Sequence, residues 1–123
     1  MAIRPTVLVV ERDSETRNLL DDLFARAGYR VLTAATGKAA YGALQAHPEI
    51  RLMLMDIGPK AKPAGIRLAT QAKRLRPALK LLYTANLAEA LSDASGGRPL
   101  AELAATPESV ALLMRIVDQL LKT

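Results

Sequence analysis

The chain alternates between short apolar runs and stretches whose apolar residues recur at helical spacing. The run at residues 6–10 is continuous and rich in valine, which is typical of a strand buried on both faces of a parallel sheet. The next segment carries Leu19, Leu20, Leu23 and Phe24 on one helical face. This alternation recurs about five times and predicts parallel strands joined by right-handed crossovers. The predicted fold is α/β, a doubly wound five-stranded parallel sheet flanked by helices on both faces.

Turn and capping residues separate the predicted elements. Asp13 or Ser14 can cap the first helix, and Gly28 stands where a left-handed residue is expected to end it. Asn86 is a candidate cap for a helix that reaches about residue 93. The start of the last helix, at residues 106–108, combines a capping threonine, a proline and an acid. We predict strands at residues 6–10, 29–33, 52–55 and 79–83 and, from the weakest pattern, at 99–104.

Length and composition exclude several classes of protein. The 123 residues suffice for one compact domain, which we expect to span residues 1–123. Without cysteine there can be no disulfide or thiolate metal site, and the single histidine, His47, excludes a multi-histidine zinc site. The first residues lack the apolar core of a signal peptide, and no apolar run approaches the roughly 20 residues of a membrane span. We therefore expect a cytoplasmic protein with no membrane partner.

Seven of the 17 basic residues lie in one stretch that contains no acid. Net charge is +5, and no acidic residue occurs between Asp56 and Glu89. We interpret this stretch as a solvated helix face; the alternative is a patch for an acidic partner or nucleic acid. Only Tyr83 interleaves with the basic residues, so nucleic acid binding is not expected. The basic residues of the stretch are Lys60, Lys62, Arg67, Lys73, Arg74, Arg76 and Lys80.

Polar residues follow three of the predicted strands directly. Glu11, Arg12 and Asp13 follow the first strand, Asp56 the third and Thr84 the fourth. In an open parallel sheet, sites form beyond the carboxyl ends of the strands. We therefore expect carboxylates and a hydroxyl to meet in one pocket. The alternative is that these residues only cap helices, which suits Asp13 better than Asp56.

Three motifs together resemble the receiver domains of response regulators. The segment 7–13 looks like the family's first strand with its acidic end, 52–57 like its phosphoacceptor strand, and 81–85 like its fourth strand. The resemblance spans roughly residues 5–121 and implies a flavodoxin-like fold. By it, Asp56 would accept a phosphoryl group from a histidine kinase, and Thr84 would hydrogen-bond that group. Glu11 and Asp13 would hold Mg²⁺ together with Asp56.

The chain also departs from the receiver pattern. Arg12 stands at a position where the family has a metal-coordinating acid, so Mg²⁺ binding is in doubt. The family's lysine–proline pair before the last helix aligns with Leu103 and Ala104, and its aromatic switch with Ala101. We hypothesise that the Arg12 guanidinium pairs with Glu11 and Asp56 in place of the metal.

These observations predict a signalling module rather than an enzyme. It would belong to a two-component or phosphorelay pathway and act through protein–protein contacts, with phosphorylation at Asp56 impaired. A phosphorylation-competent receiver is the alternative. A small metal-dependent hydrolase is disfavoured because residue 58 is glycine, not a second aspartate. The expected partner is a histidine kinase or another signalling protein; Leu112 and Ile116 on the last helix are candidates for a homodimer or partner interface, or for a wide core face.

Overall fold

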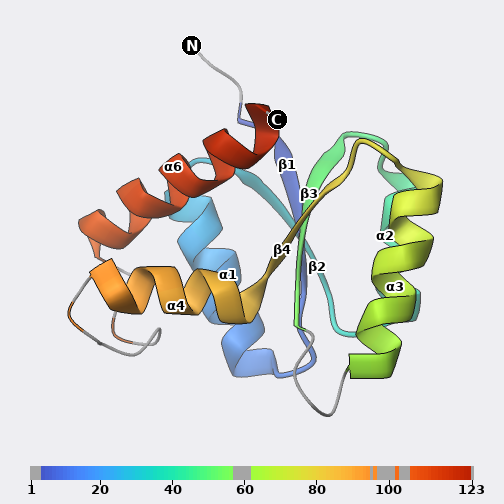
Figure 1. Ribbon diagram of the computed structural model, residues 1–123, viewed down its shortest axis with the longest axis horizontal. Coiled ribbons are helices and arrows are strands. Elements are labelled where there is room, and N and C mark those ends of the chain that lie inside the picture. The colour runs from blue at the N-terminus through green and yellow to red at the C-terminus, as the bar shows by residue number, and fades with distance from the viewer. Residues whose placement is uncertain (1–3, 57–61, 95, 97–101, 103–105, 123) are drawn as a thin grey trace.

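The computed structural model describes residues 4–56, 62–94, 96, 102 and 106–122, and it shows a parallel sheet between two helical layers (Figure 1). The sheet has the order β2-β1-β3-β4, with all pairs parallel. The strands are β1 (Thr6–Val10), β2 (Arg30–Ala34), β3 (Ile50–Met55) and β4 (Lys80–Tyr83). The α/β class and the parallel, doubly wound arrangement predicted from the sequence are confirmed.

The prediction of five strands is wrong for the sheet that the structure describes, which has four. Most of the predicted fifth strand, residues 99–104, lies outside the described residues. Glu102 is described, and it is helical rather than extended. The physical reason lies in the pattern: this segment is mainly leucine and alanine, which favour helix, and contains no β-branched residue.

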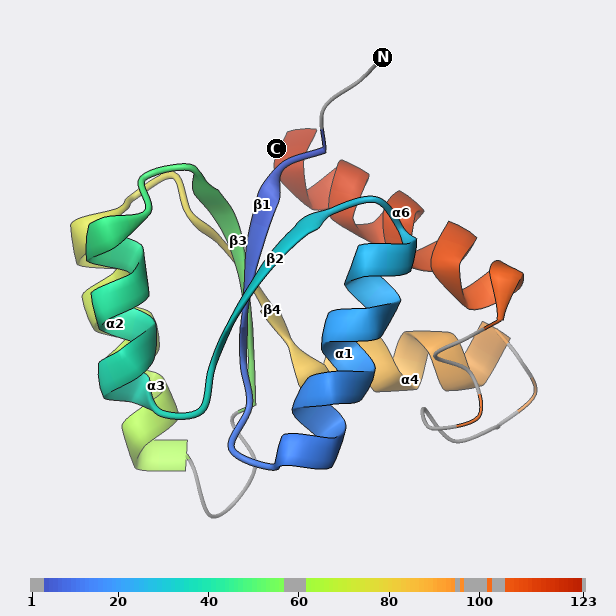
Figure 2. The same cartoon turned by 180° about the vertical axis from the view of Figure 1, so that it is seen from behind.

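Helices cover both faces of the sheet. The helices α1 (Ser14–Arg26), α4 (Thr84–Ala94) and α6 (Pro107–Lys122) lie on one face, and α2 (Gly37–Ala46) and α3 (Lys62–Leu75) on the other (Figures 1 and 2). Alternate strand residues point to opposite faces, which produces two apolar clusters. Val7, Val9 and Leu82 join the cluster under α1, α4 and α6, whereas Leu8 and Met53 join the one under α2 and α3. No helix in the described part of the chain is long and apolar enough to cross a membrane.

Most predicted helix ends are confirmed. Asp13 caps α1, and the Thr106 hydroxyl accepts a hydrogen bond from the Ser109 backbone at the start of α6. The structure adds Thr36 as the cap of α2. Gly28 follows α1 with φ +91°, a conformation that other residues rarely adopt. The prediction that α4 begins after Asn86 is wrong.

The helix α4 starts at Thr84, directly at the end of β4. Leu87 and Leu91 are one turn apart and each 1% exposed. The helix follows β4 without an intervening loop, so Asn86 lies within its first turn, where its local preference for a capping position has no effect.

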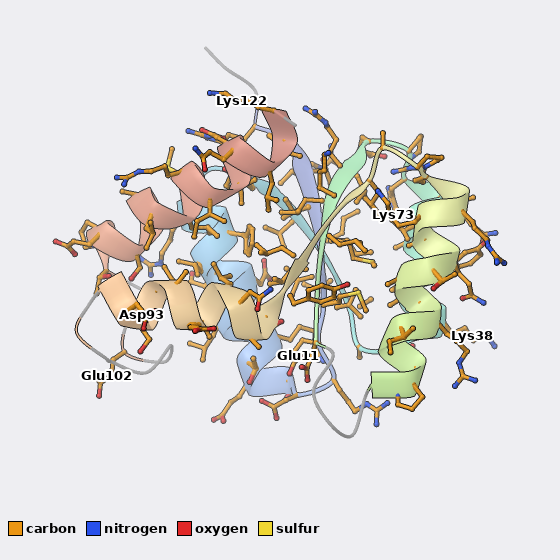
Figure 3. The ribbon with its side chains drawn as sticks, in the orientation of Figure 1. Glu11, Lys38, Lys73, Asp93, Glu102 and Lys122 are labelled. Atoms are coloured by element: carbon orange, nitrogen blue, oxygen red, sulfur yellow. The ribbon has the colours of Figure 1, made fainter. Side chains whose placement is uncertain are left out.

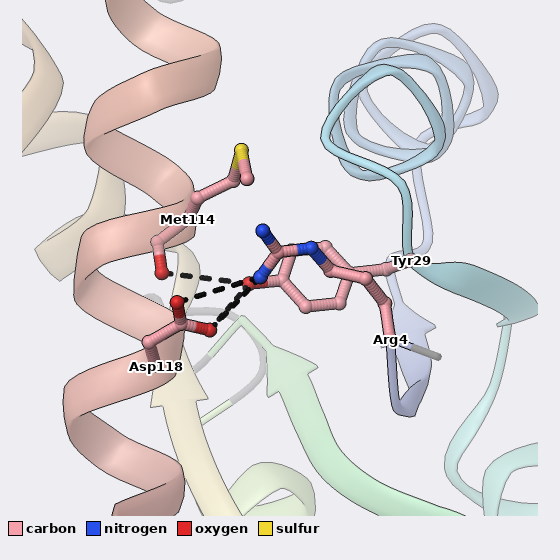
Figure 4. A network of polar contacts seen from close by, with 4 residues as sticks. All are labelled: Arg4, Tyr29, Met114 and Asp118. Carbon is pink, nitrogen blue, oxygen red and sulfur yellow. Dashed lines mark hydrogen bonds and ion pairs between the residues drawn. The ribbon is translucent and has the colours of Figure 1, made fainter. Parts of the chain in front are cut away.

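The amino ends of the strands are tied to α6 by a polar network (Figure 4). The Arg4 Nη1 atom lies 3.1 Å from Asp118 Oδ1, and the Tyr29 hydroxyl donates to the same oxygen at 3.3 Å. The Arg4 guanidinium also lies over the Tyr29 ring, 5.3 Å from its centroid. Burial, followed by the charge of Asp118, raises the pKa of Tyr29 to about 12, so its phenol remains a donor at neutral pH. The network fixes β1, β2 and α6 relative to one another.

Candidate functional site

The register of the sheet brings three predicted site residues to one edge. Val10 pairs with Met55, and Met55 pairs with Tyr83. Glu11, Asp56 and Thr84 are the residues that directly follow these three. They therefore leave three neighbouring strands at the same level, at the carboxyl edge where parallel sheets form their sites. The predicted convergence of carboxylates and a hydroxyl from separate strands agrees with this register.

Glu11 is a buried acid. Glu11 is 8% exposed, and its backbone N–H donates to the Ala34 carbonyl at 3.0 Å. Burial is the main cause that raises the pKa of its carboxyl group, and the charge of Asp56 raises it further. A hydrogen bond from the Asp13 backbone and the charge of Arg17 act in the opposite direction. Glu11 is labelled in Figure 3, near the carboxyl ends of the strands and beside α1.

Two buried polar atoms at this edge lack hydrogen-bond partners. They are Glu11 Oε2 and Thr84 Oγ1, and they are the two such side-chain atoms among the described residues. Buried polar groups are paired in the great majority of cases, so an unpaired group calls for an explanation such as a ligand. Both orphans belong to the residues that the sequence predicted for the site. The Asp56 residue, by contrast, is exposed.

Asp13 serves as a helix cap in this structure. Its Oδ2 accepts hydrogen bonds from the Thr16 backbone at 2.9 Å and from the Thr16 hydroxyl at 2.8 Å. These bonds lower the pKa of the exposed Asp13 carboxyl group. In the part of the chain that the structure describes, no three acidic or histidine side chains form a group able to hold a metal ion. The structure thus brings Glu11 and Asp56 together and leaves Asp13 at the start of α1.

The hypothesis that Arg12 pairs with Glu11 and Asp56 is wrong. All three residues are described, and no ion pair joins Arg12 to either acid. Arg12 is exposed at the bend that follows β1, whereas Glu11 before it is buried.

A different arginine, which the sequence analysis missed, lies at this edge. Arg17 Nη1 donates to the carbonyl oxygens of Glu11 at 3.0 Å and of Arg12 at 3.4 Å. The sequence could have indicated this contact. If Asp13 caps the helix, Arg17 lies one turn into it, and its side chain points back over the loop that precedes the helix. Arg17 therefore supplies the cation that was expected from Arg12, although it contacts backbone oxygens.

The remaining predicted residues lie elsewhere. Leu112 and Ile116 are partly buried and pack against the cluster under α1, α4 and α6. This favours the reading of α6 as a wide core face, and their role at an interface stays a prediction. Leu103, Ala104 and Ala101, which align with the missing lysine–proline pair and aromatic residue, lie outside the described residues.

The comparisons with known proteins agree with this geometry. The chain is 31% identical over 116 residues to the response regulator receiver protein CpdR of Brucella abortus, covering 94% of this chain and 95% of that protein. The chain belongs to the response regulator receiver family. No protein-family model matches this receiver.

Solved structures show the same fold for the receiver. A response regulator from Thermotoga maritima matches with a TM-score of 0.67 and 18% identity, covering 98% of this chain and 99% of that one. A response regulator receiver domain from Clostridium thermocellum matches with a TM-score of 0.58 and 16% identity, covering 94% and 98%. At these identities the structures support the fold alone.

Proposed function

We propose that this receiver is a signalling module that acts through protein–protein contacts and in which phosphorylation at Asp56 is impaired. One observation carries the proposal: the chain has no lysine between Lys80 and Lys122. The lysine that the family resemblance places before the last helix is therefore absent however the segment is aligned. Phosphoryl transfer depends mainly on positioning and on neutralising charge, so losing this cation is costly.

The remaining residues would still support part of the chemistry. An exposed Asp56 carboxylate is accessible to an incoming phosphoryl group. The Thr84 hydroxyl, which lacks a partner, could donate to an oxygen of that group. Losing one charge-stabilising donor at such a site costs about 3 kcal/mol of transition-state stabilisation, or roughly a hundredfold in rate. The proposed impairment is thus a slow reaction and not a change of fold.

A divalent cation would find two carboxylates at this edge. Mg²⁺ prefers oxygen ligands and often takes one or two carboxylates, with water or phosphate oxygens completing its shell. Glu11 and Asp56 fit this minimum, and the unpartnered Glu11 Oε2 is an available ligand atom. Its chemical contribution there would be to neutralise negative charge on the phosphoryl oxygens. Because Asp13 is engaged in its cap, we propose that Mg²⁺ binding is weak.

The partners follow from this proposal. We expect a histidine kinase or another signalling protein to dock at the exposed carboxyl edge. We expect this to take place in the cytoplasm, and we expect that the receiver itself is not an enzyme. A homodimer through α6 would compete with core packing for Leu112 and Ile116, which are already partly buried.

A phosphorylation-competent receiver is the second candidate. It is favoured by the two orphan atoms, because a bound cation at Glu11 and a phosphoryl oxygen at Thr84 would satisfy both. In that case the reaction would proceed with the metal and the hydroxyl alone.

Incubation with a small-molecule phosphodonor and magnesium, followed by intact-mass measurement, separates the two candidates. We expect no stable gain of a phosphoryl group in the unmodified protein. A substitution that restores a lysine at the aligned position, Leu103→Lys, should raise phosphorylation, and the double variant with Asp56→Asn should abolish that gain. Full phosphorylation of the unmodified protein, lost in Asp56→Asn, would establish the second candidate instead.

A further inference from the structure

The two helical layers of the receiver carry opposite net charges. The layer formed by α2 and α3 has five basic residues and no acidic one, a formal charge of +5. The layer formed by α1, α4 and α6 has four basic and seven acidic residues, a formal charge of −3. The sheet separates the two layers (Figures 1 and 2). Such a separation of charge draws an acidic partner towards one face of the protein.

The outward surface of α3 presents three polar side chains. Leu68 and Ala72, four residues apart, are buried in the cluster under α2 and α3. Arg67, Gln71 and Arg74 follow each other at intervals of four and three residues, which places them on one face of the helix. All three are exposed. We call these three residues the basic α3 surface.

The two arginines of the basic α3 surface have no acidic partner among the described residues. None of the ion pairs found there involves Arg67 or Arg74. On the other layer, by contrast, Arg26 pairs with Asp22 at 2.8 Å. Guanidinium groups can bind carboxylates through two parallel hydrogen bonds, so Arg67 and Arg74 are suited to carboxylates supplied by another protein.

Large apolar side chains are exposed next to these arginines. Two such side chains are exposed in the described part of the chain, Ile66 at 53% and Leu75 at 37%, and both belong to α3. Ile66 precedes Arg67, and Leu75 follows Arg74. A partner that covers apolar side chains gains hydrophobic free energy. The helix therefore offers apolar contact as well as positive charge.

The basic α3 surface stands on a rigid base. At the end of α3, the Arg76 guanidinium donates to the carbonyls of Leu44 at 3.4 Å, His47 at 3.2 Å and Ile50 at 2.6 Å. These bonds join the end of α3 to the end of α2 and to the start of β3. A surface that is already ordered loses little conformational entropy when a partner binds.

We propose that the basic α3 surface binds an acidic segment of a partner protein. Carboxylates of that segment would pair with Arg67 and Arg74, and its apolar side chains would cover Ile66 and Leu75. Charge steers the encounter and selects the partner, whereas burial of the apolar side chains adds affinity. This surface is distinct from the phosphoacceptor site, because it lies along α3 and includes no residue that directly follows a strand.

Two other occupants match the surface less well. A nucleic acid also carries negative charge, but its phosphates gain nothing from Ile66 and Leu75, and α3 contains no aromatic residue on which a base could stack. A second copy of this chain would have to use the acidic layer, where Asp22 and Asp118 already pair with arginines. A partner protein can supply both free acids and apolar side chains.

The test uses the isotope-labelled receiver and a synthetic peptide in which three glutamates separate each leucine from the next. NMR amide shifts should centre on the basic α3 surface, and Asp56→Asn should bind the peptide as tightly as the unmodified receiver. Replacing the glutamates by glutamines should abolish binding, and replacing the leucines by alanines should weaken it about threefold or more. Undiminished binding of the glutamine peptide, or shifts centred away from α3, would overturn the proposal.

Charge reversal of Arg67 provides the matched comparison. Arg67→Glu should weaken binding of the acidic peptide about fivefold or more at low salt, whereas Arg115→Glu, the same charge change at an exposed position of α6, should leave it within about twofold. Equal weakening by both variants would reduce the effect to net charge and overturn the site. Tighter binding of single-stranded DNA at the same residues would overturn the assignment to a protein partner, and concentration-dependent shifts there without peptide would replace that partner by a second copy.

Discussion

The two ends of the sheet differ in how their polar groups are satisfied. At the amino end, Arg4, Tyr29 and Asp118 form a closed network that joins two strands to α6. At the carboxyl end, Glu11 and Thr84 each bury an oxygen without a hydrogen-bond partner. A satisfied network stabilises the fold, whereas an unsatisfied one reduces stability and leaves groups available for a ligand. The comparison separates residues that hold the receiver together from those that we propose serve its function.

The largest effect is expected from removing the ring at the centre of the amino-end network. Tyr29 is 4% exposed, and its ring centroid lies 5.9 Å from that of Phe24. Tyr29→Ala should lower the free energy of unfolding by about 3 kcal/mol or more in urea denaturation. Tyr29→Phe keeps the ring and loses only the hydroxyl, so it should cost about 1 kcal/mol. Equal losses in the two variants would show that the ring packing does not matter.

A smaller effect is expected from the acid of the same network. Asp118→Ala removes the acceptor of both Arg4 and Tyr29 and should cost about 1 kcal/mol, allowing for an Asp118 side chain that is 46% exposed. Asp22→Ala is the matched control, because it breaks an exposed pair with Arg26 within α1. It should cost less than about 0.5 kcal/mol. Thermal unfolding of the two variants in parallel checks the difference.

At the carboxyl end, removing a polar group should not lower the stability of the protein. Thr84→Val replaces a buried hydroxyl that lacks a partner by a methyl group of similar size, and it should leave stability unchanged or raise it by up to about 1 kcal/mol. Thr70→Val is the control, since the exposed Thr70 hydroxyl donates to the Ile66 carbonyl. A clear loss of stability in Thr84→Val would mean that the hydroxyl contributes to the fold, and the comparison between the two ends would fail.

The smallest effect concerns the pH dependence of stability. The pKa of Glu11 is raised in the folded protein, so its contribution is present below about pH 4.5 and is lost as pH rises through the folded pKa. Asp13 has the opposite sign: its lowered pKa stabilises the fold above pH 3.8, and this is lost as pH falls through the folded pKa. Urea denaturation across this pH range measures the free energy of unfolding. In Glu11→Gln this free energy should no longer fall as pH rises, and in Asp13→Asn it should no longer fall as pH decreases.

Sequence periodicity was sufficient to predict most of the fold. The buried strands from residues 6–10 and 52–55, the cap at Asp13 and the glycine at position 28 are all set by local preference, and the structure confirms them. The start of α4 was not predictable in this way, because the local residues do not show that the helix follows β4 without a loop. The predicted fifth strand rested on the weakest pattern in the chain, and most of it lies outside the described residues.

The site was predictable in its members and not in their contacts. Glu11, Asp56 and Thr84 could be placed at one edge because parallel strands end together. The direction in which each side chain points could not be predicted, because the sequence does not fix the backbone conformation of the residues that follow a strand. Arg12 is exposed, and Arg17 on α1 contacts the backbone carbonyls of Glu11 and Arg12 instead. The capping role of Asp13 followed from the local helix start.

The central claim is that the carboxyl edge holds a buried acid, Glu11, with one carboxyl oxygen that no described residue hydrogen-bonds. An NMR titration of the side-chain carboxyl carbon of Glu11, with and without magnesium, tests it most directly. We predict a midpoint above 4.5 that moves little when magnesium is added at physiological concentration. A midpoint at or below 4.5, or tight saturable binding of magnesium at Glu11 and Asp56, would contradict the account.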